Sequence, residues 1–155
     1  MSTVQVTSHR ADLLISDRAG NPVATVELKN RKDMSRDVAV EFRRNLAAHG
    51  ALESTPYFLL LSQDAGYLWR NAAPGDLLAL PSAEFPMRAV VERYSPRRAW
   101  SKRLRESEFS ALIFRWLQSL TQPLVAARDP AETTLDRLGL LEAMRGGAIV
   151  DQAVV

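Results

Sequence analysis

The sequence predicts a single α/β domain in which helices flank a central mixed β-sheet. Two strand-like segments, residues 10–15 and 23–29, are separated by a turn, and a helical pattern over residues 34–50 follows them. The run at residues 57–61 is apolar without alternation, which is typical of a strand covered on both faces of an α/β sheet. A chain of 155 residues is long enough to form one such domain with a substantial core.

The first elements are predicted to form a β-hairpin. Residues 3–15 read as one long strand or as two short strands with a break near Ser8. Residues 17–22 contain Gly, Asn and Pro, each of which favours a turn. The second strand then covers residues 23–29.

The helix over residues 34–50 has recognisable ends and an apolar stripe. Ser35 is a suitable N-cap, and Gly50 is well placed to end the helix. The apolar residues that recur at helical spacing are Val38, Ala39, Phe42 and Leu46.

The middle of the chain is less regular. A turn at residues 64–66 leads into a return strand at residues 67–70, which suggests a second hairpin. Several prolines predict a loop over residues 71–86, and residues 87–94 are compatible with either a strand or a helix.

The last third is predicted to be mainly helical. Residues 106–120 form an amphipathic pattern whose apolar side includes Trp116. Asp129 is a suitable cap for another helix, which breaks near Gly139 and ends at residues 146–147, before a short strand at residues 148–154. We therefore divide the single domain, residues 1–155, into a motif-bearing core (1–70), a loop-rich basic segment (71–105) and the C-terminal helices and strand (106–155).

Composition limits the chemistry that the chain can perform. It has no cysteine, which excludes disulfides, zinc–thiolate sites and cysteine nucleophiles and fits a cytoplasmic protein. Neither a secretory leader nor an apolar run long enough for a membrane span is visible, so we expect no membrane association. The net charge of +2 permits a nucleic-acid partner without requiring one.

The residues with the clearest chemical meaning are Asp12, Glu27 and Lys29. Glu27 and Lys29 share one face of their strand, because side chains alternate along a strand. If Ser16 pairs with Val23 across the turn, the antiparallel register places Asp12 opposite Glu27. Two facing carboxylates destabilise a sheet unless a group lies between them, and a divalent metal is a natural occupant. The alternative is an exposed strand face with a weak Glu–Lys ion pair.

This constellation resembles the active site of the PD-(D/E)xK nuclease superfamily over residues 10–70. The resemblance implies a restriction-endonuclease-like fold. It also implies that Asp12, Glu27 and the Leu28 carbonyl bind Mg²⁺ or Mn²⁺, and that Lys29 is the catalytic amine. The implied activity is metal-dependent hydrolysis of phosphodiester bonds in nucleic acid, by an endonuclease or exonuclease, with DNA favoured over RNA.

The chain also departs from that family. The helix that usually precedes the motif is missing, or it is replaced in space by the C-terminal helix over residues 106–120. A homodimer or a partner subunit is a further way to cover that flank. Ala11 stands where the family has Pro, and no Gln follows the triplet. A non-catalytic nuclease-like domain that binds nucleic acid or a protein within a larger assembly therefore stays an alternative, as does an unrelated α/β fold.

Basic residues suggest where nucleic acid would bind. The candidate basic residues form two groups. One lies in the helix after Lys29, and the other lies in the most basic stretch, in which Tyr94 and Trp100 are interleaved. A solvated basic linker is the competing interpretation of the second group. Weaker candidates are His9 beside the motif, Arg31 and Lys32 after it, and Arg93 and Arg105 at the ends of the basic stretch. The predicted nucleic-acid-binding residues are Arg36, Arg43, Arg44, Arg97, Arg98, Lys102 and Arg103.

Overall fold

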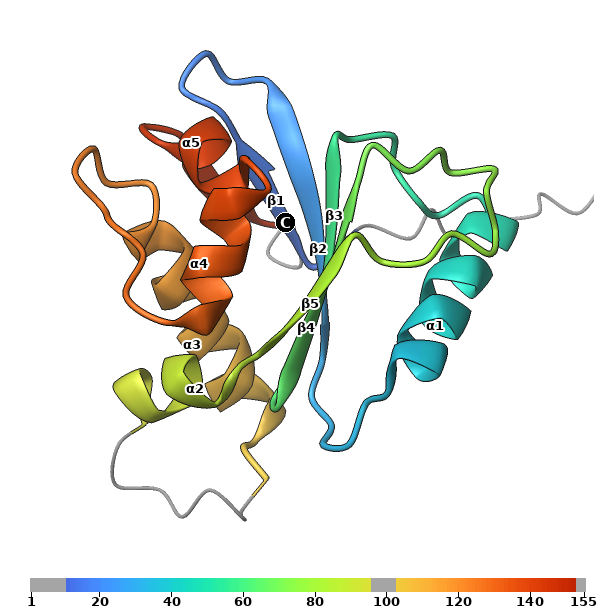
Figure 1. Cartoon of the computed structure of the whole chain (residues 1–155), viewed down its shortest axis with the longest axis horizontal. Coiled ribbons are helices and arrows are strands. Elements are labelled where there is room, and N and C mark those ends of the chain that lie inside the picture. The colour runs from blue at the N-terminus through green and yellow to red at the C-terminus, as the bar shows by residue number, and fades with distance from the viewer. Residues whose placement is uncertain (1–10, 96–102, 153–155) are drawn as a thin grey trace, which may run out of the picture.

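A six-stranded mixed sheet separates two helical layers, as expected for an α/β domain (Figure 1). The computed structural model describes residues 11–95 and 103–152. Among the described helices, α1 stands alone against one face of the sheet, and α2 to α5 gather on the other (Figure 1). The strands are β1 (Leu13–Ser16), β2 (Pro22–Lys29), β3 (Tyr57–Ser62), β4 (Ala65–Arg70), β5 (Ala83–Pro86) and β6 (Ala148–Asp151). The helices are α1 (Arg36–Ala48), α2 (Arg88–Tyr94), α3 (Glu106–Ser119), α4 (Pro130–Arg137) and α5 (Leu140–Met144).

The centre of the sheet is the parallel pair β2 and β3. The strand order is β5-β4-β3-β2-β1-β6, and every other neighbouring pair is antiparallel. A parallel pair needs a crossover connection, which α1 provides. Both faces are therefore covered: Leu60 of β3 packs with Ala39 of α1, and Leu59 and Leu61 pack in the core on the opposite face.

Helix α1 begins where its sequence indicates. The Ser35 side chain accepts a hydrogen bond from the Val38 backbone N–H (3.2 Å), so the predicted N-cap is confirmed. The buried side chains of the helix are those of Ala39 and Arg43, whereas Val38, Phe42 and Leu46 are only partly buried. The predicted apolar stripe thus lies at the margin of the interface with the sheet.

The second helical layer forms the larger core. The predicted amphipathic helix is α3, and its residues Leu112, Ile113, Trp116 and Leu117 are buried. Asp129 caps α4 by accepting a hydrogen bond from the Glu132 backbone N–H (2.9 Å), as predicted. Gly139 separates α4 from α5 with a left-handed backbone (φ +88°), which explains the break expected there.

A buried ionic network, the Glu132 cluster, joins three helices of this layer. Its members are Arg93, Trp116, Arg128, Asp129 and Glu132. The Glu132 carboxylate is fully buried, and it accepts hydrogen bonds from Arg93 (2.9 Å), Trp116 (2.9 Å) and Arg128 (3.0 Å). Burial acts to raise the pKa of Glu132, but the hydrogen bonds from Arg128 and Trp116 outweigh it, so this pKa lies below its ordinary value. The cluster fixes α2, α3 and α4 relative to one another.

Strand β6 closes the sheet beside β1. The pairing runs from Leu13 with Asp151 to Ser16 with Ala148, and the Gln152 backbone N–H donates to the Asp12 carbonyl (3.1 Å). A Cβ atom on Gly147 would lie 1.9 Å from the Ser16 carbonyl oxygen, so this close approach requires glycine.

One sequence expectation is wrong and one ambiguity is resolved. The segment predicted to be a loop over residues 71–86 contains β5, a short edge strand that ends in proline. The segment over residues 87–94, which was compatible with either a strand or a helix, is the helix α2.

Arg93, one of the basic candidates, forms ion pairs with the carboxylates of Asp129 and Glu132. No helix within the described ranges has the length and apolar character that a membrane span requires.

We expect Glu132→Gln to reduce the free energy of unfolding by about 3 kcal/mol at neutral pH, because it removes the buried counter-charge of Arg128 and one of the two carboxylates that hold Arg93. A carboxylate whose pKa is lowered by folding contributes stability above its ordinary pKa of 4.5 and loses that contribution as the pH falls through the lowered value. The difference between the two proteins should therefore shrink below about pH 4.5. Urea titrations across this pH range measure it.

Glu92→Gln is the matched control for this substitution. Glu92 accepts from Arg88 four residues away (2.8 Å), but both side chains are more than half exposed. Its loss should change the free energy of unfolding by less than about 0.5 kcal/mol. Equal effects of the two variants would contradict a structural role for the Glu132 cluster.

Candidate metal and nucleic-acid site

The pairing of β1 with β2 places Asp12 opposite Glu27. Leu13 pairs with Val26, and continuing this register by one residue aligns Asp12 with Glu27. The pairing of Ser16 with Val23 that we expected is wrong, because an irregularity between Ile15 and Ser16 pairs Ser16 with Pro22. This irregularity lies at the turn end of the hairpin, so the register at Leu13 is the predicted one.

Asp12 is held against the strand that carries the Glu-x-Lys triplet. It lies just before β1, and its Oδ2 accepts a hydrogen bond from the Leu28 backbone N–H (2.8 Å). The side chain thereby takes the place of a backbone partner at the point where the β1–β2 ladder ends. Its carboxylate is fixed beside the peptide that joins Glu27 to Leu28.

Glu27 is an interior residue and not part of a solvated strand face. Only 2% of it is exposed, and it pairs with Leu60, which packs with α1. Burying a carboxylate is costly unless a partner compensates for the lost hydration. The burial of Glu27 distinguishes it from an ordinary surface glutamate, whose carboxylate stays hydrated.

Lys29 lies on the same face, at the end of β2. Its Nζ is 5.0 Å from the centroid of the Phe42 ring of α1, a cation–π contact. Lys29 forms no ion pair with any residue in the described ranges. The exposed Glu–Lys ion pair considered as an alternative is thus not the arrangement that the structure contains.

The donor atoms of this candidate site suit a hard divalent cation. Asp12, Glu27 and the Leu28 carbonyl supply oxygen, which Mg²⁺ prefers. The described residues contain no group of three or more His, Cys, Asp and Glu side chains placed to hold a metal. A site with two carboxylates is nonetheless typical of Mg²⁺, which keeps several waters and binds substrate phosphate directly.

Arg43 does not belong to an exposed basic surface. It is 1% exposed and donates to the carbonyls of Asp76 (2.6 Å) and Ala73 (2.9 Å), and its guanidinium lies 5.9 Å from the Trp69 ring. Burial lowers the pKa of Arg43, and the nearby Asp76 partly counteracts this effect. Its side chain holds the loop after β4 against α1, so Arg43 is not part of the candidate nucleic-acid surface.

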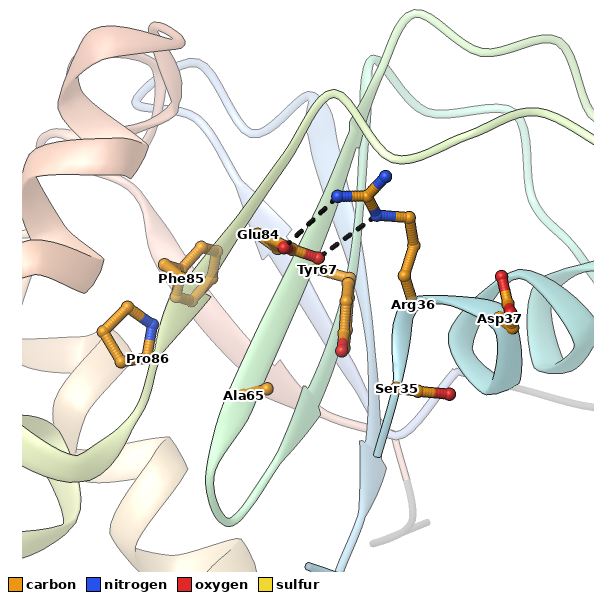
Figure 2. A pocket seen from close by; sticks show the side chains of 8 residues that line it. All are labelled: Ser35, Arg36, Asp37, Ala65, Tyr67, Glu84, Phe85 and Pro86. Carbon is orange, nitrogen blue, oxygen red and sulfur yellow. Dashed lines mark hydrogen bonds and ion pairs between the residues drawn. The ribbon is translucent and has the colours of Figure 1, made fainter. Parts of the chain in front are cut away.

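The side chains of Arg36 and Arg44 on α1 are both exposed, and each forms an ion pair with a glutamate. Arg44 lies 3.8 Å from Glu41, one turn away. Figure 2 shows Arg36 reaching Glu84 across an open hollow of about 730 Å³, on the β4–β5 side of α1. The hydrogen bond to Glu84 raises the pKa of Arg36, and the Tyr67 hydroxyl in the same hollow donates to the Met34 carbonyl (2.6 Å). Arg36 is thus paired with Glu84, and the Tyr67 hydroxyl is bonded to the backbone. None of these groups belongs to the candidate metal site.

The end of the basic segment is attached beside Lys29. The Asn30 side chain donates to the Leu104 carbonyl (2.7 Å), the Leu104 N–H donates to Gln63 Oε1 (3.0 Å), and Arg103 donates to the Asn30 carbonyl. Asn30 and Gln63 directly follow β2 and β3, whose carboxyl ends share one edge of the sheet. Arg97, Arg98 and Lys102 lie outside the described residues, as do His9 and Trp100.

Sequence reasoning missed Asn30 and Gln63. Polar residues immediately after two adjacent parallel strands were the available signal, because such residues meet at the same sheet edge. Their partner Leu104 lies more than seventy residues from Asn30, and no local pattern indicates that contact.

Comparisons of this chain with protein-family models, with curated proteins and with solved structures yield no match.

We expect Arg43→Ala to lower the free energy of unfolding by about 3 kcal/mol, because it opens a cavity beside Trp69 and removes the hydrogen bonds that Arg43 donates to the carbonyls of Ala73 and Asp76. The adjacent exposed residue provides a control of the same type: Arg44→Ala should cost less than about 0.5 kcal/mol. Thermal and urea unfolding measure both. Similar stabilities of the two variants would contradict this structural role of Arg43.

Proposed function

We propose that this domain is a metal-dependent nuclease that hydrolyses phosphodiester bonds in nucleic acid. In this proposal Asp12, Glu27 and the Leu28 carbonyl hold Mg²⁺ or Mn²⁺, and Lys29 is the catalytic amine. The observation that carries it is the alignment of Asp12 with the buried Glu27, beside a lysine that has no ion-pair partner among the described residues.

Each residue has a distinct physical task. The Leu28 N–H fixes Asp12, and the interior of the sheet fixes Glu27, so both carboxylates are ordered before substrate arrives. The metal, when bound, lowers the pKa of a coordinated water. The Lys29 ammonium, directed by the Phe42 ring, stabilises negative charge that develops on the phosphate and helps to position the attacking water.

The topology supports a restriction-endonuclease-like assignment. The motif lies on a hairpin of a mixed sheet, α1 follows it, and β3 returns parallel to β2. Helices from the C-terminal half cover the other face, where α3 packs near β6. In this interpretation they replace the helix that precedes the motif in the family.

The placement of one basic residue supports nucleic acid as the substrate. Arg103 contacts the backbone of Asn30, one residue after Lys29. A basic side chain far from Lys29 in the sequence thus lies beside the candidate site. Arg and Lys side chains there would neutralise the phosphates that flank the bond to be cut.

The second candidate is the same domain without catalysis, binding nucleic acid or a protein partner. The lack of a third acidic or histidine ligand among the described residues favours it. The loop between β4 and β5 also exposes Leu78 (68%) and Leu80 (67%), which suits a second copy or a partner subunit.

Calorimetric titration of Mg²⁺ and Mn²⁺ tests the metal site. The parent should bind, and both Asp12→Asn and Glu27→Gln should abolish the heat of binding, because each removes a carboxylate ligand. Glu84→Gln, on the same face but in the hollow beside β5, should leave binding unchanged. Binding that survives in Asp12→Asn and Glu27→Gln would place the metal elsewhere.

Cleavage assays test Lys29. Lys29→Ala should reduce the rate on single- and double-stranded substrates by at least about a hundredfold, because a preorganised charge at the reacting group is lost. Its far-ultraviolet circular dichroism should match that of the parent. Lys32→Ala, three residues further along, is the control and should retain cleavage. A Lys29→Ala protein that cuts at the parental rate would refute this role.

A further inference from the structure

A second, smaller pocket lies beside Lys29, between α1 and the connection that follows β2. We call it the Phe42 pocket; it has a volume of about 250 Å³ and is lined by Arg31, Val38, Glu41, Phe42 and Asn45. Its four α1 residues recur at spacings of three and four and therefore share one face of the helix. They include Val38 and Phe42, which are partly buried and pack against the core on the α1 face of the sheet.

An aromatic ring close to two cations gives the Phe42 pocket its chemical character. The Phe42 ring centroid is 5.0 Å from Lys29 Nζ and 6.0 Å from the Arg31 guanidinium carbon. Neither cation forms an ion pair with another described residue. The one carboxylate that lines the pocket, Glu41, lies 3.8 Å from Arg44 and is partly neutralised by it. The surroundings therefore favour a planar group that is joined to a negatively charged one.

The remaining polar group is suited to the edge of a heterocycle. Asn45 is exposed, and its amide supplies both a donor and an acceptor, the combination with which Asn and Gln recognise base edges. The volume is below the roughly 300 Å³ at which pockets for larger ligands begin. It suits a single ring system and is too small for a base pair.

We propose that the Phe42 pocket binds one unpaired nucleobase of a single-stranded nucleic acid, stacked on Phe42 and Arg31, while the adjoining backbone passes Lys29. This inference rests on the proposed function, since it assigns the strandedness of the substrate of the same site. A base within a duplex is stacked on its neighbours and hydrogen-bonded to its partner, so only a base without a partner can enter.

Fluorescence anisotropy with a labelled single-stranded DNA of about twelve nucleotides tests the pocket, with the blunt duplex of the same sequence as the second probe. Chelator replaces divalent metal, so that no strand is cut. Phe42→Leu keeps an apolar side chain but removes the aromatic face. It should weaken single-strand binding by about tenfold and leave duplex binding within about twofold. Phe114→Leu in α3, on the other side of the sheet, is the matched control and should alter neither.

A third probe, with abasic sites in place of several bases, separates stacking from backbone contacts. Removing the bases should weaken binding to the parent but have little further effect on Phe42→Leu, because the two changes delete the same interaction. Losses that add independently would overturn the proposal. So would unchanged binding by Phe42→Leu, equal weakening for single strand and duplex, or a parent that does not bind the single strand.

These outcomes can be distinguished from a failure of the proposed metal binding and nuclease activity. A protein that binds Mg²⁺ through Asp12 and Glu27 and cuts DNA, but whose single-strand binding is unaffected by Phe42→Leu, loses only the nucleobase pocket. A protein without a metal site that still shows the non-additive loss retains the pocket and becomes a single-strand-binding domain.

Discussion

The parallel pairing of β2 with β3 is the constraint on which the rest of the structure depends. Parallel strands cannot be joined by a tight turn, so α1 must cross over one face of the sheet between them. Both strands are then buried on both faces, and a second layer must cover the opposite side. Helices α2 to α5 supply it, and the Glu132 cluster holds three of these helices in fixed relation.

This constraint also determines the surroundings of the candidate site. Glu27 occupies a strand that is covered by α1, which accounts for the burial of its carboxylate. The parallel pairing brings the ends of β2 and β3 to one edge, where Asn30 and Gln63 hold the chain that enters α3. The side chain of Lys29 lies toward α1 at that same edge. The hairpin that carries the candidate metal ligands, the end of the basic segment and the Phe42 pocket therefore adjoin one another without belonging to one stretch of sequence.

Local patterns predicted most elements, and long-range contacts account for what they missed. The caps at Ser35 and Asp129 are short-range interactions, which can be recognised within a few residues. By contrast, Arg43 was read as a surface cation, because its acceptors belong to a loop some thirty residues away. The edge strand β5 was missed because it is short and ends in proline, and its pairing depends on β4. The register of Leu13 with Val26, which when continued aligns Asp12 with Glu27, was predicted correctly from an incorrect pairing at the turn.

The pairing of β1 with β6 has a consequence for how the molecule assembles. Strand β1, which follows Asp12, pairs on its outer side with β6, near the end of the described chain. The backbones of Asp12 and Gln152 are hydrogen-bonded, and nearly every other element lies between these two residues in the sequence. Contacts between distant parts of a sequence form late, since the entropy of closing a long loop must be overcome first. During synthesis, the hairpin that carries Asp12 and Glu27 is made before β6 and lacks this outer neighbour until residue 151 has emerged. The sheet around the candidate site is thus completed only after every intervening element has been made.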